Sequence, residues 1–180
     1  MKIAYGSDLH LEFSDGRPSL KSVADADVLI LAGDIDVGID KSSGCPKALL
    51  YAQTCAQELE IPVLVIAGNH EFYGREYFSY LGACRNHVAE MGNVFFLENE
   101  TVQLEGVTFI GCTLWTTFSS APHLEFALAN AADSITDFRK IKYSPRGASS
   151  YPVHYTHLTP PQDNEMKITE VHEPIKTNHT

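Results

Sequence analysis

Three short apolar runs, each followed by glycine and polar side chains, constrain the fold of this chain more than any other feature. They are IAY before GSDLH, VLILA before GDID and VLVIA before GNHE. Runs of this length that are rich in Val and Ile and do not alternate with polar residues are typical of strands buried on both faces of a parallel sheet. The sequence therefore predicts an α/β (α+β) fold built around these strands.

The segment between the second and third runs has the periodicity of a helix. From Pro46 to Glu60, small and apolar residues fall on one helical face, namely Ala48, Ala52, Cys55, Ala56 and Leu59. Pro46 suits the first turn of such a helix. Strand, helix and strand in this order imply a right-handed crossover between parallel strands. We expect further helices over residues 75–91 and 122–133.

Short strands and then a change of composition mark the second half of the chain. Segments 94–97, 101–104 and 107–112 are separated by turn-like residues, which predicts a meander and hence a mixed sheet. After Tyr143 the chain carries five prolines and few large apolar residues. We therefore divide the chain into a core over residues 1–143 and a loosely packed tail over residues 144–180, with one short helix beginning near Thr159.

Composition excludes several classes of partner. The formal net charge of −10 argues against nucleic acid, because binding that neutralises many phosphates needs clustered Lys and Arg. No apolar run of about 18 residues and no leader is visible, so we expect no membrane partner and a cytoplasmic location. The four cysteines are widely spaced and form no C-x-x-C pair, which predicts reduced, buried thiols.

Residues that can bind metal follow each of the three apolar runs. Loops that leave the carboxyl ends of neighbouring parallel strands converge on one crevice. Five side chains of this type come within a few residues of those ends: Asp8, His10, Asp34, Asn69 and His70. Carboxylates, imidazoles and an amide oxygen together suit Mn, Fe or Zn. Each motif alone is compatible with an ordinary turn, and only their combination predicts a metal site.

In this order, GSDLH, GDID and GNHE resemble the D-x-H, GD and GNH[DE] blocks of the calcineurin-like metallophosphoesterases. The stretches AGNHEFYG, FLEN, GCTLWT and DFRKIK extend the resemblance to the small single-domain bacterial branch, over roughly residues 1–143. The resemblance implies an α/β/β/α sandwich with mixed sheets. It also implies a metal-dependent hydrolase that cleaves phosphate mono- or diesters, with two divalent ions, Mn, Fe or Zn, as cofactors and a small phosphate ester as substrate.

The resemblance also implies a role for each matching residue. Asp8 and His10 would bind the first metal, Asp34 would bridge both metals, Asn69 would bind the second, and His70 would be the catalytic residue that assists the leaving group. A carboxylate shared by two cations lets them activate one water and hold the phosphoryl oxygens. A histidine beside such a site can donate a proton to the departing oxygen.

The family pattern contains a further GH-x-H block that has no counterpart here, since the sequence has no Gly-His dipeptide and no H-x-H after His70. The segment 157–180 resembles the stretch that precedes the family's next histidine, which makes His179 a candidate additional metal ligand. We therefore expect the C-terminal half of the sandwich to be truncated. A sheet without its partner exposes apolar surface, so we also expect a homo-oligomer that covers it.

Three hypotheses of different classes remain. The chain is a phosphoesterase whose site is completed by tail histidines, by a second subunit or within a longer parent chain. Alternatively, it is a truncated or degenerate member that acts as a non-catalytic metal-binding or interaction module. The third hypothesis is an unrelated doubly wound binding domain, against which the order of the motifs argues.

Overall fold

The computed structural model describes residues 1–115, 118 and 121–143 of the chain. Its central sheet holds four strands in sequence order, namely β1 (Ile3–Gly6), β2 (Val28–Ala32), β3 (Val63–Ile66) and β4 (Val94–Phe96). Neighbouring strands are all parallel, with one row of paired residues running Ala4, Leu29, Val63 and Val94. The three apolar runs therefore form adjacent parallel strands, as the sequence predicts.

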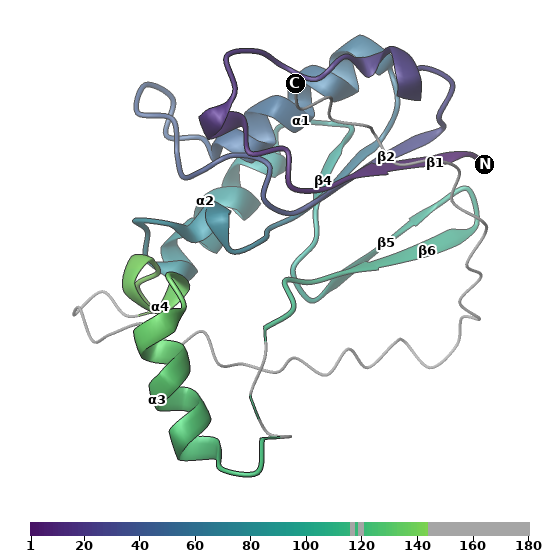
Figure 1. Cartoon of the computed structure of the whole chain (residues 1–180). Helices are drawn as coiled ribbons and strands as arrows, with labels where there is room; N and C mark the ends of the chain where they lie inside the picture. Colours follow the sequence, from purple (N-terminus) through teal and green to yellow (C-terminus); the bar gives the residue numbers. More distant parts are fainter. Residues whose placement is uncertain (116–117, 119–120, 144–180) are drawn as a thin grey trace.

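Two helices cover one face of this sheet (Figure 1). They are α1 (Lys47–Leu59) and α2 (Tyr77–Val88), which lie within the segments predicted to be helical. The core between sheet and helices contains Leu29 and Val65 from the strands, Leu49 from α1 and Tyr80 from α2, all almost fully buried. Alternate strand residues point to the other face, so both faces of the sheet are apolar.

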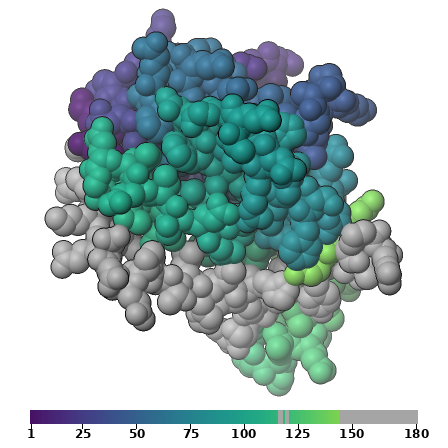
Figure 2. All heavy atoms as spheres, turned by 180° about the vertical axis from the view of Figure 1, so that it is seen from behind, coloured from purple at the N-terminus to yellow at the C-terminus, as the bar shows by residue number. Residues whose placement is uncertain are grey.

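A two-stranded antiparallel ribbon lies on the other face of the sheet. It consists of β5 (Glu100–Leu104) and β6 (Val107–Gly111). Val102 and Phe109 of the ribbon belong to one apolar cluster with the buried Val28 and Leu64 of the sheet. Seen from behind, the teal-green ribbon forms part of the molecular surface (Figure 2). Helix, sheet and ribbon give the first three layers of the expected α/β/β/α sandwich.

The predicted meander is wrong for β4. This strand pairs in parallel with β3, whereas β5 and β6 pair only with each other, so the central sheet is parallel and not mixed. Close spacing along the chain was a poor guide here because Phe96 and Leu97 are buried between the layers. Burying them on both faces of the parallel sheet removes more apolar surface from water than an exposed hairpin would.

Two helices follow the ribbon, and the second returns the chain to the sheet. Figure 1 shows α3 (Leu124–Ser134), in green, extending away from the sheet, and the side chain of its Phe126 is 69% exposed. The short α4 (Asp137–Lys140) then lies against the segment after β3, where Gly74 donates a backbone hydrogen bond to Lys140 over 2.8 Å. This return brings Asp137 next to the loops at the carboxyl ends of the strands.

All four cysteines are buried and free, in agreement with the sequence prediction. Within the described residues, no helix is long and apolar enough to cross a membrane. The predicted tail over residues 144–180, its short helix near Thr159 and the candidate ligand His179 lie outside the described residues.

Two glycine substitutions test this layer arrangement. A Cβ on Gly111 would lie 2.5 Å from Cβ of Leu97 and 3.2 Å from Cγ1 of Ile66, whereas a Cβ on Gly82 of α2 would meet nothing within 4 Å. We expect Gly111→Ala to lower the free energy of unfolding by about 1–3 kcal/mol through overpacking. Gly82→Ala should raise it by up to about 1 kcal/mol, since alanine is the better helix former. Urea denaturation followed by circular dichroism measures both, and equal stability of the two variants would contradict the packing of the ribbon on the sheet.

Candidate functional site

The candidate site lies where the loops leave β1, β2 and β3. Parallel pairing continues past the strands, because Asp8 donates its backbone N–H to Gly33 and His10 donates to Asp34, each over 3.0 Å. Asp8, His10 and Asp34 all have positive φ, at 54°, 45° and 55°. Left-handed backbone is tolerated better by Asp and His than by bulkier or branched residues. The two loops therefore turn sharply while still held together.

Gly33 and Gly68 bring the backbones of two of these loops into close contact. A Cβ on Gly33 would lie 2.9 Å from both Cα and N of Gly68, and Gly33 has a φ of +88°. A Cβ on Gly68 would collide with the Asp34 carboxylate. Only glycine fits at either position, so the glycines of GDID and GNHE bring the two motifs into direct contact.

The buried side chain of Glu71 holds these two loops together through hydrogen bonds to their backbones. Its side chain is 1% exposed, and its carboxylate accepts backbone N–H bonds from Ile35 at 2.6 Å, Gly68 at 2.8 Å and Asp34 at 3.0 Å. Burial raises the pKa of the Glu71 carboxyl, and the backbone N–H groups of Ile35 and Asp34 oppose the rise. Glu71 is therefore the buried link between the GDID and GNHE loops.

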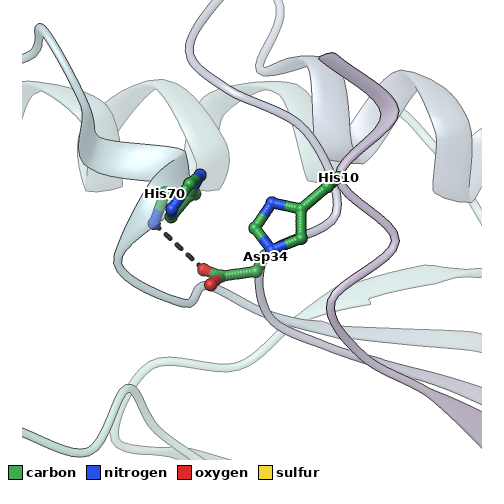
Figure 3. Close-up of side chains that lie close together, drawn as sticks. All are labelled: His10, Asp34 and His70. Carbon is green, nitrogen blue, oxygen red and sulfur yellow. Dashed lines mark hydrogen bonds between the residues drawn. The ribbon is translucent and has the colours of Figure 1, made fainter. Parts of the chain in front are cut away.

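Three side chains that can bind metal converge next to Glu71 and its loops: His10, Asp34 and His70. Their ligand atoms lie within 4.8 Å of one another, and all three residues are partly buried. The two imidazole rings stand edge to face with centroids 4.5 Å apart. Asp34 Oδ1 accepts the backbone N–H of His70 at 3.0 Å, which is the dashed line in Figure 3. The structure thus brings one residue from each of the three motifs to one point.

Glu12 contacts both histidines, and the sequence analysis did not identify it. Its Oε1 lies 3.1 Å from Nδ1 of His10 and 2.9 Å from Nδ1 of His70. Burial opposes ionisation, but hydrogen bonds from His70, the local backbone and His10 outweigh it and hold the pKa of this carboxyl below its ordinary value. No local pattern indicates this contact, because Glu12 lies in the 3₁₀ helix Leu11–Phe13 and its partner His70 is 58 positions away in the sequence.

Asn69 is oriented by two residues that the sequence analysis also missed. Its Nδ2 donates to Asp137 Oδ1 at 2.8 Å and contacts the Tyr73 hydroxyl at 3.2 Å, while that hydroxyl donates to the same Asp137 oxygen at 2.6 Å. Burial and the bond to Asp137 raise the pKa of Tyr73. Because the amide nitrogen is engaged, the amide oxygen of Asn69 is the atom left for a cation.

Asp8, like Asn69, is a candidate ligand that lies outside the three-residue group. Its side chain is exposed and lies outside the set formed by His10, Asp34 and His70. The backbone of Asp8 nevertheless pairs with the GDID loop at Gly33. The structure therefore puts Asp8 at the rim of the site.

A pocket with a cationic lining adjoins the site. It has a volume of about 390 Å³ and is lined by Val37, Gly38, Ile39, Asp40, Lys41, Lys47, Tyr73 and Arg75. The Tyr73 ring lies 4.3 Å from the His70 ring, which connects the pocket to the three-residue group. Three cations gather here although the chain as a whole is acidic, a cluster that the sequence did not reveal.

The residues present fit a divalent cation. Two imidazoles and one carboxylate converge, a donor set that suits Mn, Fe or Zn. A second observation agrees with this: Glu12 Oε2 is buried and makes no hydrogen bond within the part of the chain that the structure describes. A buried carboxylate oxygen without a donor is costly unless positive charge lies nearby.

Comparisons with known proteins give matches over most of the chain. A family model described as calcineurin-like phosphoesterase matches residues 1–176. An uncharacterised protein of Acanthamoeba polyphaga mimivirus is 30% identical over 155 residues, which make up 78% of this chain and 51% of that protein. The crystal structure of phosphopantetheinyl hydrolase from Mycobacterium tuberculosis matches with a TM-score of 0.57 and 19% identity, over 84% of this chain and 56% of that one. The chain thus spans about half the length of both relatives.

Removing the buried carboxylate should destabilise the site and the fold together. Glu71→Ala leaves the N–H groups of Asp34, Ile35 and Gly68 without their acceptor, and each such loss costs about 1–3 kcal/mol. We expect the free energy of unfolding, measured by urea denaturation, to fall by about 3 kcal/mol or more. Glu90→Ala, at an exposed position, is the control and should stay within about 0.5 kcal/mol of the unmodified chain. A Glu71→Ala protein as stable as that control would contradict the role of Glu71.

Proposed function

The chain belongs to the calcineurin-like phosphoesterase family, and we propose that it hydrolyses phosphate mono- or diesters at the site formed by His10, Asp34 and His70. The observation that carries this proposal is the convergence of those three side chains within 4.8 Å at the carboxyl ends of adjacent strands. Crevices at this end of a parallel sheet are where α/β proteins bind their ligands.

We assign the metal-binding roles to residues around this point. His10 and Asp34 would hold one ion with Asp8, and Asp34 would extend to a second ion with Asn69. Bound divalent cations would lower the pKa of a water and neutralise charge on the phosphoryl oxygens. The backbone N–H of His70 donates a hydrogen bond to Oδ1 of Asp34. This bond orients the carboxylate and leaves Oδ2 for a cation. Asp137 similarly fixes the amide group of Asn69.

His70 is proposed as the group that protonates the leaving oxygen. Its Nδ1 is engaged by Glu12 at 2.9 Å, which leaves Nε2 to face a substrate. The imidazolium form would give its Nε2 proton to the leaving oxygen and become the neutral ring with hydrogen on Nδ1. The Tyr73 ring packs 4.3 Å away on the His70 ring and restricts its rotation. A donor held in one orientation can transfer its proton without first losing conformational freedom.

The substrate is proposed to be a small phosphate ester that occupies the pocket next to Tyr73. Lys41, Lys47 and Arg75 line this pocket, and Lys47 lies 3.5 Å from Asp36 in an ion pair. An anionic ester approaching a chain with a net charge of −10 meets repulsion over most of the surface. Clustered cations would lower that repulsion in the pocket, whose Tyr73 contacts the His70 ring.

A second candidate function is a non-catalytic metal-binding module that holds a single ion. The observation that favours it is the position of Asp8, which is exposed and outside the three-residue group. Three ligands fit one ion, whereas a dinuclear centre needs donors for two. The number of bound ions separates the two candidates.

We expect the chain to bind two Mn²⁺ ions, measured by elemental analysis after equilibration and removal of free ion. Asp34→Asn should lower Mn²⁺ affinity by more than about tenfold, because a ligand with full negative charge is replaced by a neutral amide. The control is Asp133→Asn, which changes an exposed acid in α3. One ion per chain would favour the module, and no binding would refute both candidates.

We expect His70→Ala to lower turnover of p-nitrophenyl phosphate or bis(p-nitrophenyl) phosphate by about 10²- to 10⁴-fold, the contribution of a general acid. Mn²⁺ stoichiometry, measured on the same sample, should not change. His123→Ala, at an exposed position before α3, is the matched control. Turnover that survives His70→Ala would remove the residue from the mechanism, and loss of bound Mn²⁺ would make it a metal ligand instead.

A further inference from the structure

Glu12 joins the two histidines of the site through a single oxygen. It lies in the one-turn 3₁₀ helix Leu11–Phe13 that follows His10, and its side chain is 13% exposed. Oε1 lies 3.1 Å from Nδ1 of His10 and 2.9 Å from Nδ1 of His70. The two histidines are 60 positions apart in the sequence, so this contact links the first motif directly to the third.

The chemistry of these groups determines where the imidazole protons lie. An ionised carboxylate has no hydrogen to donate, so a hydrogen bond to Glu12 requires hydrogen on Nδ1 of each ring. A neutral imidazole with hydrogen on Nδ1 carries its lone pair on Nε2, which is then the only ring atom able to bind a cation.

We propose that Glu12 is a positioning residue that holds His10 and His70 in the Nδ1–H tautomer, with Nε2 of both rings left for the chemistry of the shared site. The inference deepens the proposed function and rests on it for the role of Nε2. It does not depend on that function for the tautomers themselves, which follow from the two contacts to Oε1.

The surroundings of Glu12 favour this role over a contribution to packing alone. Its Oε2 is buried without a hydrogen bond among the described residues, so the carboxylate is costly to keep in this place. A neutral side chain of similar size would avoid that cost if packing were its only purpose. A carboxylate that accepts Nδ1–H from a metal-binding histidine instead fixes the ring and makes the other nitrogen a better ligand.

Sharing one oxygen also couples the two rings. The rings stand edge to face at an interplanar angle of 72°, so neither can rotate freely while both hold the same acceptor. Figure 3 shows the His10 ring directed toward Asp34, with His70 hydrogen-bonded to Asp34 through its backbone N–H. Loss of Glu12 should therefore disturb His10 and His70 together, whereas a change at either histidine disturbs one ring.

The test is a long-range ¹H–¹⁵N spectrum of the full chain with ¹⁵N-labelled histidine, recorded without metal at a pH where the imidazoles are neutral. We expect Nδ1 of His10 and His70 to give the protonated-nitrogen shift and Nε2 to give the lone-pair shift. Glu12→Gln should mix the tautomers of both rings and weaken Mn²⁺ binding by about 10- to 100-fold. Glu90→Gln, which removes an exposed carboxylate, should change neither measurement.

Hydrogen on Nε2 of either ring in the unmodified chain would overturn the inference without any variant, so a Glu12→Gln protein that fails to fold does not block the test. A folded Glu12→Gln protein with unchanged tautomers and unchanged Mn²⁺ affinity would overturn it as well. If the unmodified chain binds no Mn²⁺, the proposed function fails, while the tautomers still decide whether Glu12 positions the two rings.

Discussion

The buried Glu71 carboxylate is the interaction on which the rest of the site depends. It sits between the loops after β2 and β3 and takes N–H groups from both, at Asp34, Ile35 and Gly68. Without a shared acceptor these N–H groups would need separate partners, and the left-handed backbone at Asp34 would lose its support. The two loops can then touch at Gly33 and Gly68, and Asp34 can reach the backbone of His70.

A second carboxylate, Glu12, organises the side chains in the way that Glu71 organises the backbone. Glu12, Asp34 and Glu71 place three acids in and beneath a partly buried site, and two of them accept several N–H groups each. Neutral donors offset part of the cost of burying this charge, and a cation is the remaining means of offsetting it. These three carboxylates favour a cation at the site, whichever substrate it takes.

The sequence was sufficient for the elements with strong local patterns. The three apolar runs predicted β1, β2 and β3, because strands buried on both faces are continuously apolar. The helical face of Pro46–Glu60 predicted α1, because its apolar residues repeat with a period of 3.6. The meander failed because strand pairing of β4 depends on which layer buries Phe96, a property of the whole fold. Glu12 and Asp137 were missed for a related reason, since their partners His70 and Asn69 lie 58 and 68 positions away. The burial of Glu71 could not be read from its neighbours in sequence either, because its partners Asp34 and Ile35 lie 37 and 36 positions away.

The charge balance of the proposed ligands bears on how such a site would treat a phosphate ester. Two divalent cations held by Asp8, His10, Asp34 and Asn69 would carry four positive charges against the two negative charges of the Asp8 and Asp34 carboxylates, so a net positive charge would remain. Glu12 does not cancel that charge at close range, because its Oε1 faces the Nδ1 atoms on the far side of the rings. An anion would therefore be attracted to the ions themselves, and Lys41, Lys47 and Arg75 would extend the attraction into the neighbouring pocket. The chain has a net charge of −10, so selectivity for a phosphate ester would come from the positive charge that is concentrated at this site and its pocket.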